Sequence, residues 1–295
     1  MTDRPRDPGL LIQIHIPRCA GTSVGNWLRN AALRGVLTGF RAVYPDFVIE
    51  TDSDYLAAGF GDLRLTAVTT HNIRKFPPTI LGRKAHYFSI LREPLAHMLS
   101  CIRYMRQERV AFDLPAALGD ETRDIAAWLL ARSLDSPFRE NPQTNHLALA
   151  TWCAATSRPC EPETYGRWSS ADHQAYWNER LDVAKGVLRS FLCAGTVERL
   201  NETIELLCAR SHNAGIELLP AEQMVHVNAT SHDNDDLTWM EPNHPLGRQL
   251  RDSIAVDAEL YAFTNAMLDE INGGGPRGYR RMSTAGPESL TPASP

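Results

Sequence analysis

"LLIQIHIPRCAGTSVGNWLRN", residues 10–30, combines a strand pattern, a turn and a helix pattern in immediate succession. The run Leu10–Ile16 is apolar apart from Gln13 and His15, as expected for an interior strand of a parallel sheet. Apolar residues then recur at helical spacing over Thr22–Leu33. The segment therefore predicts a buried strand that turns directly into a helix.

The turn between them has the composition of an anion-binding loop. A strand that passes through Gly21 into a helix directs backbone N–H groups and the positive end of the helix dipole at one point. Thr22 and Ser23 add hydroxyl donors, and Arg18 adds a fixed positive charge. The alternative is an ordinary strand–helix connection with a surface arginine.

This loop differs from the triphosphate loop G-x-x-x-x-G-K-S/T. In that motif a Lys directly before the hydroxyl residue reaches the β- and γ-phosphates, and the hydroxyl binds magnesium. Here Gly21 occupies the Lys position, and the basic residue, Arg18, lies four positions before Thr22. We therefore expect the loop to bind a single phosphate that carries a small group. A kinase or an ATPase is the weaker interpretation.

The remaining chain predicts alternating strands and helices. Strands are expected at Leu65–Thr70, His86–Leu91 and Phe191–Gly195, and helices after Pro94, over Arg199–His212 and within Pro245–Ile271. This alternation is typical of an α/β protein whose parallel sheet is flanked by helices. Ligands of such sheets bind at the carboxyl ends of the strands.

Composition narrows the domain organisation and the class of function. We expect one domain over residues 1–272 with a helical insertion at about 109–190, and a disordered tail over 273–295, where Gly, Pro, Ser and Thr dominate.

The net charge of -5 argues against a nucleic-acid partner. No apolar stretch is long enough for a signal peptide or a membrane span, so we expect a cytoplasmic protein without a membrane partner. The six cysteines form no C-x-x-C pair and no zinc-like cluster, so we expect reduced thiols and no metal.

A second anion-binding segment follows another predicted strand. In "SILREPLAHMLSCIRYM", residues 89–105, Arg92 ends the strand and Pro94 begins a helix, where proline is tolerated. Ser100 follows Arg92 by eight residues, about two helical turns, so the two side chains can bind a second phosphate together. The alternative is that Arg92 pairs with Glu93 or another neighbouring carboxylate.

Together these segments resemble a known family. "IHIPRCAGTS" resembles the 5′-phosphosulfate loop of sulfotransferases, H-x-P-K-x-A-G-T-S/T, and "LREPLAHMLS" resembles their 3′-phosphate motif, L-R-D/N-P-x-x-R-x-x-S. "FLCAGTVERLNETIELL" is similar to a later strand–helix segment of the carbohydrate sulfotransferases that include the heparan sulfate 2-O- and 6-O-enzymes. The resemblance covers roughly residues 10–270, and is thin between 105 and 190.

The resemblance implies a P-loop-like sulfotransferase fold and the donor 3′-phosphoadenosine 5′-phosphosulfate (PAPS). It implies that Arg92 and Ser100 bind the 3′-phosphate, and that the 5′-phosphosulfate is bound by Arg18, Cys19, Ala20, Gly21, Thr22 and Ser23. This sequence departs from the family at three of these motif positions. Arg18 replaces the usual Lys, so it can stabilise charge on the leaving group but cannot donate its proton. Cys19 replaces Thr or Ser, and His97 replaces a frequent Arg, which is expected to weaken a supporting contact.

A general base is also needed, because the acceptor hydroxyl must lose its proton. His71 directly follows a predicted strand, lies between the two donor motifs, and matches the place where related glycan sulfotransferases carry a catalytic His. We predict that His71 is this base; the alternative is a His that caps a strand end. His15 is expected to be a core residue of the first strand. Asn145, His146 and Trp168 are candidate acceptor contacts.

The sequence thus favours a cytoplasmic, PAPS-dependent O-sulfotransferase. A bacterial enzyme that acts on a hydroxyl of a small molecule, a natural product or a saccharide fits best. No basic groove for a long sulfated polysaccharide is visible between residues 139 and 185. Two alternatives are a P-loop small-molecule kinase, which would need ATP and magnesium, and a non-catalytic nucleotide-binding protein of the same fold.

Overall fold

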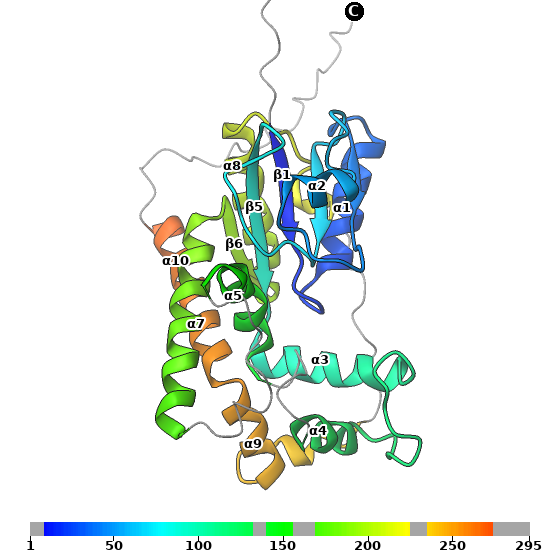
Figure 1. Cartoon of the computed structure of the whole chain (residues 1–295), viewed down its shortest axis with the longest axis vertical. Helices are drawn as coiled ribbons and strands as arrows, with labels where there is room; N and C mark the ends of the chain where they lie inside the picture. The colour runs from blue at the N-terminus through cyan, green and yellow to red at the C-terminus, as the bar shows by residue number, and fades with distance from the viewer. Residues whose placement is uncertain (1–8, 132–139, 156–168, 225–234, 274–295) are drawn as a thin grey trace, which may run out of the picture.

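The protein has an α/β fold built around a parallel sheet (Figure 1). The computed structural model describes residues 9–131, 140–155, 169–224 and 235–273. The strands are β1 (Leu10–Ile14), β2 (Phe40–Ala42), β3 (Ala67–Thr70), β4 (Thr79–Ile80), β5 (Arg83–Leu91) and β6 (Cys193–Thr196). Five of them form a parallel sheet in the order β2-β3-β1-β5-β6, and β4 pairs antiparallel with the start of β5. This order is consistent with a P-loop-like topology.

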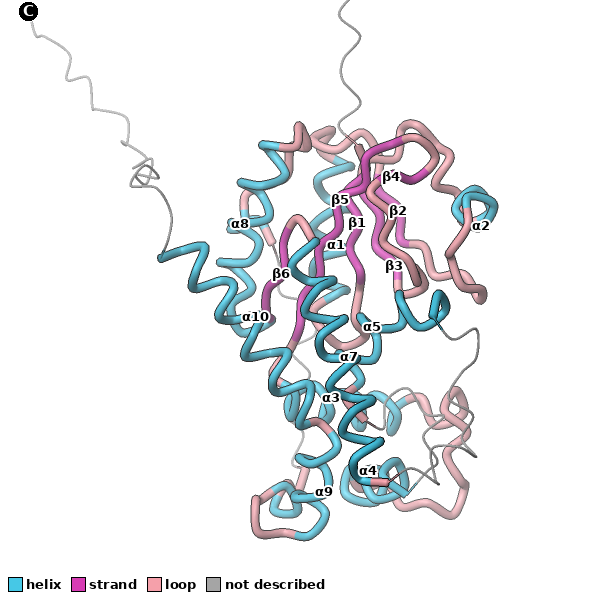
Figure 2. The backbone as a smooth tube through the Cα atoms, turned by 60° about the vertical axis from the view of Figure 1, so that its left-hand side comes forward, coloured by secondary structure: helices cyan, strands magenta, loops and turns pink. Residues whose placement is uncertain are grey.

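Helices flank the sheet and extend beyond its carboxyl edge (Figure 2). They are α1 (Gly21–Leu33), α2 (Asp52–Ala57), α3 (Pro94–Gln107), α4 (Thr122–Ala131), α5 (Pro142–Ala155), α7 (Ser170–Ser190), α8 (Leu200–Asn213), α9 (Pro245–Ser253) and α10 (Ala255–Gly273). Short 3-10 segments cover Val197–Arg199, Ala221–Gln223 and Thr238–Met240. Within the described residues, no helix is both long and apolar enough to cross a membrane.

Both faces of β1 are buried, which explains its nearly continuous apolar sequence. Leu11 packs on one face with apolar residues of α1 and α8, which are Val24, Trp27, Leu28, Ile204 and Leu207. Leu10 and Ile12 pack on the other face with residues of α7 and α10, which are Leu181, Ala184, Leu188 and Leu260. The strand is thus sandwiched between two helical layers, and this fixes the position of the loop that follows it.

A third, smaller core lies below the carboxyl ends of the strands, where α3, α4 and α9 meet (Figure 1). Met98 and Ile102 of α3 belong to this cluster together with Leu129 of α4 and Leu250 of α9. The region between residues 109 and 190, predicted to be a helical insertion, contains α4, α5 and α7. The predicted tail lies outside the described residues from 274 onward.

The predicted α/β class and parallel sheet are confirmed, with differences at element boundaries. β1 ends at Ile14, so His15 and Ile16 belong to the following loop. The long helix expected within Pro245–Ile271 is two helices, broken at Ile254, where φ is -120° and ψ is 15°. The break has a specific cause: the side chain of Asn141 accepts the N–H groups of Val256 and Asp257, at 3.0 and 3.1 Å, and so caps a new helix start.

Candidate functional site

The loop between β1 and α1 presents backbone donors at the carboxyl edge of the sheet. Arg18 and Ala20 have left-handed backbone conformations, with φ of 66° and 57°. Such a conformation costs about 1 kcal/mol or more for a non-glycine residue, so it is maintained where the fold requires it. Among the residues that the structure describes, no side chain caps the start of α1, whose first residue is Gly21. The dipole of this helix therefore favours an anion at the loop.

The two predicted anion-binding segments lie in direct contact. The Arg18 Nε donates to Ser100 Oγ at 3.1 Å, and the Arg92 guanidinium donates to the Arg18 carbonyl at 3.3 Å. The Arg18 guanidinium also lies over the ring of Tyr104, 5.0 Å from its centre. Residues separated by about eighty positions in the sequence thus form one basic surface. The sequence paired Ser100 with Arg92, whereas the structure bonds the Ser100 hydroxyl to Arg18.

These arginines have no carboxylate counter-ion within the described residues. Glu93, the alternative partner of Arg92, instead accepts the N–H groups of Leu95 and Ala96, at 3.1 and 2.7 Å, and caps α3. Among the described residues, no Asp or Glu lies within ion-pair distance of Arg18 or Arg92. Two half-buried positive charges next to a helix N-terminus favour binding of an anionic ligand.

His97 supports the loop from α3. Its Nε2 donates to the Pro17 carbonyl at 2.8 Å, and its side chain is buried. Burial lowers the pKa of His97 to about 4, so the ring is neutral at pH 7. From the motif resemblance we expected that His97, at a position where Arg is frequent, would weaken a supporting contact. In this structure His97 makes a direct hydrogen bond to the loop.

His71 lies one residue beyond β3, at the same edge of the sheet. Its Nδ1 hydrogen-bonds the backbone carbonyl of His15. A carbonyl only accepts, so Nδ1 carries the proton and Nε2 is left as a proton acceptor. Burial lowers the pKa of His71, which keeps the ring neutral at pH 7. A neutral imidazole with a free Nε2 has the form that a general base requires.

Two further aromatic side chains surround His71. Tyr44 stacks on it with ring centres 4.5 Å apart, and the His15 ring lies 4.4 Å away. The Tyr44 hydroxyl contacts His15 Nδ1 at 3.2 Å and Thr69 Oγ1 at 3.4 Å. Sequence reasoning missed Tyr44. The signal for it was its position just after a strand, but β2, which precedes it, was not predicted.

The prediction that His15 is a core residue of the first strand is wrong. β1 ends at Ile14, and the partly exposed His15 ring lies at the site instead. A Cβ atom added to Gly21 would lie 1.7 Å from His15 Nε2, so Gly21 is required for the imidazole to pack against the start of α1. Burial, followed by the neighbouring His71, lowers the pKa of His15 to about 3.

The other residues predicted to bind the 5′-phosphosulfate differ in their exposure and in their hydrogen bonds. Thr22 is exposed at the loop, whereas Ser23 is buried. The Cys19 side chain is also buried and donates to Gln143 Oε1 at 3.6 Å, and its backbone N–H donates to the Ile16 carbonyl at 3.1 Å. Both donors of Cys19 are therefore engaged within the protein.

The candidate acceptor residues are brought to different places. The His146 ring centre lies 6.4 Å from that of His71, so this residue borders the site. Burial lowers its pKa to about 3. Asn145 instead points to α7, where its Oδ1 accepts from Arg180 at 3.3 Å. Trp168 lies outside the described residues.

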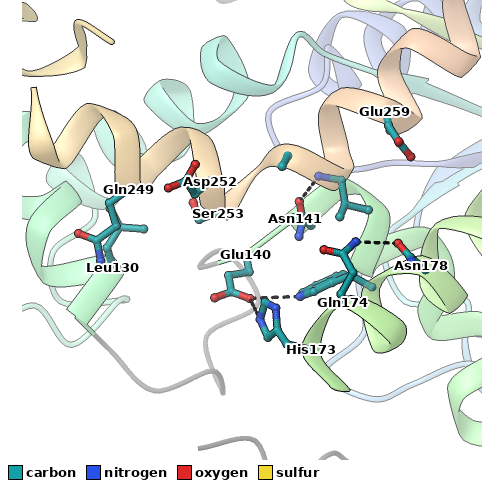
Figure 3. Close-up of a pocket in the computed structure, with 13 residues that line it drawn as sticks. Leu130, Glu140, Asn141, His173, Gln174, Asn178, Gln249, Asp252, Ser253 and Glu259 are labelled. Atoms are coloured by element: carbon teal, nitrogen blue, oxygen red, sulfur yellow. Dashed lines mark hydrogen bonds and ion pairs between the residues drawn. The ribbon is translucent and has the colours of Figure 1, made fainter. Parts of the chain in front are cut away.

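A cavity of about 350 Å³ lies elsewhere, between α4, α7, α9 and α10 (Figure 3). Three carboxylates line it, those of Glu140, Asp252 and Glu259. Glu140 accepts hydrogen bonds from Trp177 at 3.3 Å and from His173 at 3.1 Å, so it is part of the local structure. Because these charges repel anions, this cavity does not suit a phosphate ligand.

Comparisons with models of known protein families and with curated proteins find no match for this chain.

Proposed function

We propose that the protein is an O-sulfotransferase that moves the sulfuryl group of PAPS to an acceptor hydroxyl. The observation that carries this proposal is the convergence of Arg18 and Arg92, which have no carboxylate partner among the described residues, on a loop beside the neutral His71. An anionic donor and a base for a hydroxyl proton are the two requirements of this reaction.

The two arginines have separate roles in this proposal. Arg18, with the N–H groups at the start of α1, binds the 5′-phosphosulfate, and Arg92 binds the 3′-phosphate together with Ser100, whose hydroxyl also accepts from Arg18 Nε. The resemblance of "IHIPRCAGTS" and "LREPLAHMLS" to the two donor motifs of sulfotransferases supports this division. The parallel sheet supports it too, because both segments follow its strands.

The chemistry proceeds in one displacement. The acceptor oxygen attacks sulfur, forming the new S–O bond while the bond from sulfur to the phosphate oxygen breaks. His71 Nε2 takes the hydroxyl proton, and the leaving group departs as adenosine 3′,5′-bisphosphate. Arg18 stabilises the charge that develops on the departing phosphate without giving up a proton.

The acceptor in this proposal is a small molecule, a natural product or a saccharide. Tyr44, 48% exposed, presents an aromatic surface beside His71. Such a surface packs well on a sugar ring or on a flat scaffold, which supports an acceptor of this kind.

The test is transfer of label from PAPS that is radioactive in its sulfuryl group, using a mixture of alcohols, phenols, sugars and cell-extract metabolites as acceptors. We expect label in a new product with the wild-type protein and at least about a hundredfold slower labelling with His71→Ala. If all label stays in the donor while the protein phosphorylates acceptors from ATP and magnesium, the sulfotransferase proposal is wrong.

A further inference from the structure

Gln143 holds the backbone of Arg92 through both ends of its side-chain amide. Its Oε1 accepts the Arg92 N–H at 2.9 Å, and its Nε2 donates to the Arg92 carbonyl at 2.8 Å. The side chain is fully buried. Cys19 of the loop donates to the same Oε1 at 3.6 Å. One buried amide therefore connects both anion-binding segments.

The side-chain amide of Gln143 lies at the carboxyl end of β5, just beyond its last paired residue. The last register pair between β5 and β6 is Leu91 with Thr196, so Arg92 is the first residue beyond the ladder. Its N–H and carbonyl need other partners, because unpaired buried backbone groups are costly. Gln143 supplies both partners, in the way a neighbouring strand would.

Gln143 is itself fixed by an exchange of caps between α5 and α10. The Asp257 carboxylate accepts the N–H groups of Gln143 and Thr144, at 3.1 and 2.7 Å. In return Asn141 accepts the N–H groups of Val256 and Asp257. Each helix start thus satisfies donors of the other, so the amide is presented from a rigid framework.

We propose that Gln143 is a positioning residue, which holds the Arg92 backbone so that its guanidinium distinguishes a ligand with a 3′-phosphate from one without it. The Arg92 guanidinium already reaches the Arg18 carbonyl at 3.3 Å, so the placement of the backbone sets the distance between the two anion sites. This inference rests on the proposed function, because it takes the 3′-phosphate of the donor as the ligand of Arg92.

The experiment is calorimetric titration of the full chain with adenosine 3′,5′-bisphosphate and with adenosine 5′-phosphate. Gln143→Met keeps the length of the side chain but leaves the Arg92 backbone groups unpaired. We expect the Kd of the bisphosphate to rise about tenfold or more, while the Kd of the monophosphate changes little. A residue needed only for packing would affect both nucleotides alike.

A double variant tests whether the effect passes through Arg92. Arg92→Ala should remove the preference for the bisphosphate, and adding Gln143→Met to it should cost no further affinity. Thr144→Val is the matched control, since it alters the neighbouring buried position, whose backbone N–H bonds Asp257, and should keep the preference. If Gln143→Met does not fold, Gln143→Asn, which is too short to reach both groups, takes its place.

The possible results separate this inference from the proposed function. A wild-type protein that binds both nucleotides equally would contradict the proposed function itself. A wild-type preference that survives in the folded Gln143 variant would overturn the positioning role alone. The same role is overturned if Thr144→Val loses the preference as well, because then any disturbance of α5 has this effect.

Discussion

The Nδ1–H of His71 donates a hydrogen bond to the backbone carbonyl of His15, and this bond joins the carboxyl ends of two neighbouring strands. The acceptor is a main-chain atom, so the tautomer of His71 does not depend on the side chain at position 15. The bond leaves Nε2 of a neutral ring available at the edge where Arg18 and Arg92 lie. The central chemical element of the proposed site is therefore set by backbone geometry.

Replacing His71 should remove catalysis and preserve donor binding. Because general-base catalysis contributes about 10²- to 10⁴-fold, we expect His71→Ala to lower kcat by that factor. The Kd for adenosine 3′,5′-bisphosphate should stay close to that of the wild type in a calorimetric titration. The control is His212→Ala, which removes an exposed His bonded to Glu217. Unchanged turnover in His71→Ala would show that another group takes the proton.

The pH dependence should report the burial of His71 by Tyr44. Burial lowers the pKa of His71 below 6.5, and the base is active only when its ring is neutral. We therefore expect kcat/KM to rise with pH and to reach its plateau at a lower pH than it would with an exposed imidazole as the base. Tyr44→Leu removes the stacked ring and exposes the imidazole, so this rise should move to higher pH and kcat should fall about three- to tenfold. Tyr44→Phe keeps the ring and should keep the profile. A profile that is identical in Tyr44→Leu would refute the role of the stack.

Because Gly21 and His15 are in contact, substitutions at the two positions should have non-additive effects on the free energy of unfolding. Gly21→Ala forces its Cβ against the imidazole, so we expect a loss of about 1–3 kcal/mol in the free energy of unfolding. Adding His15→Ala removes the obstacle and should recover most of this loss. Gly25→Ala in the same helix is the control, since its Cβ would meet Thr69 only at 3.8 Å. Additive losses in the urea unfolding of the double variant would contradict the steric account.

Asp257 should make stability depend on pH. Burial raises its pKa from 3.8 to about 6, although hydrogen bonds from Thr144 and Gln143 oppose this. Because the folded state holds the proton more tightly, the contribution of Asp257 is largest below pH 4 and is lost as pH rises to 6. The difference in unfolding free energy between the wild type and Asp257→Asn should therefore fall by about 2 kcal/mol between pH 4 and pH 7. A difference that is constant with pH would show that this carboxyl titrates normally.

Much of the fold could be predicted because its central strands are buried on both faces. β1, β3, β5 and β6 all lie within or beside apolar runs that sequence periodicity detects. β2 escaped detection because it has only three residues, Phe40–Ala42, with a charged Arg41 at its centre. The break at Ile254 could not be predicted, because its cause is Asn141, more than a hundred residues away in the sequence.

The candidate site, like the fold, could be predicted only in part from the sequence. Arg18, His71 and Arg92 were accessible to sequence reasoning because each follows a predictable strand or lies in a recognisable motif. Tyr44 and Gln143 were not, because their roles come from tertiary contacts, and Gln143 lies 51 positions from Arg92. His15 was misplaced for a local reason: the apolar run continues to Ile16, while the hydrogen-bonded strand stops at Ile14.

Thermal unfolding with nucleotides tests whether PAPS is the donor, because it needs no knowledge of the acceptor. A ligand at 100 times its Kd adds about 2.7 kcal/mol, which should raise the Tm by a few degrees for a chain of this size. We predict this rise with adenosine 3′,5′-bisphosphate, its loss in Arg92→Ala, and its retention in Arg64→Ala, a control at an exposed arginine. No rise with the bisphosphate, or a rise only with ATP and magnesium, would contradict the assignment of PAPS as the donor.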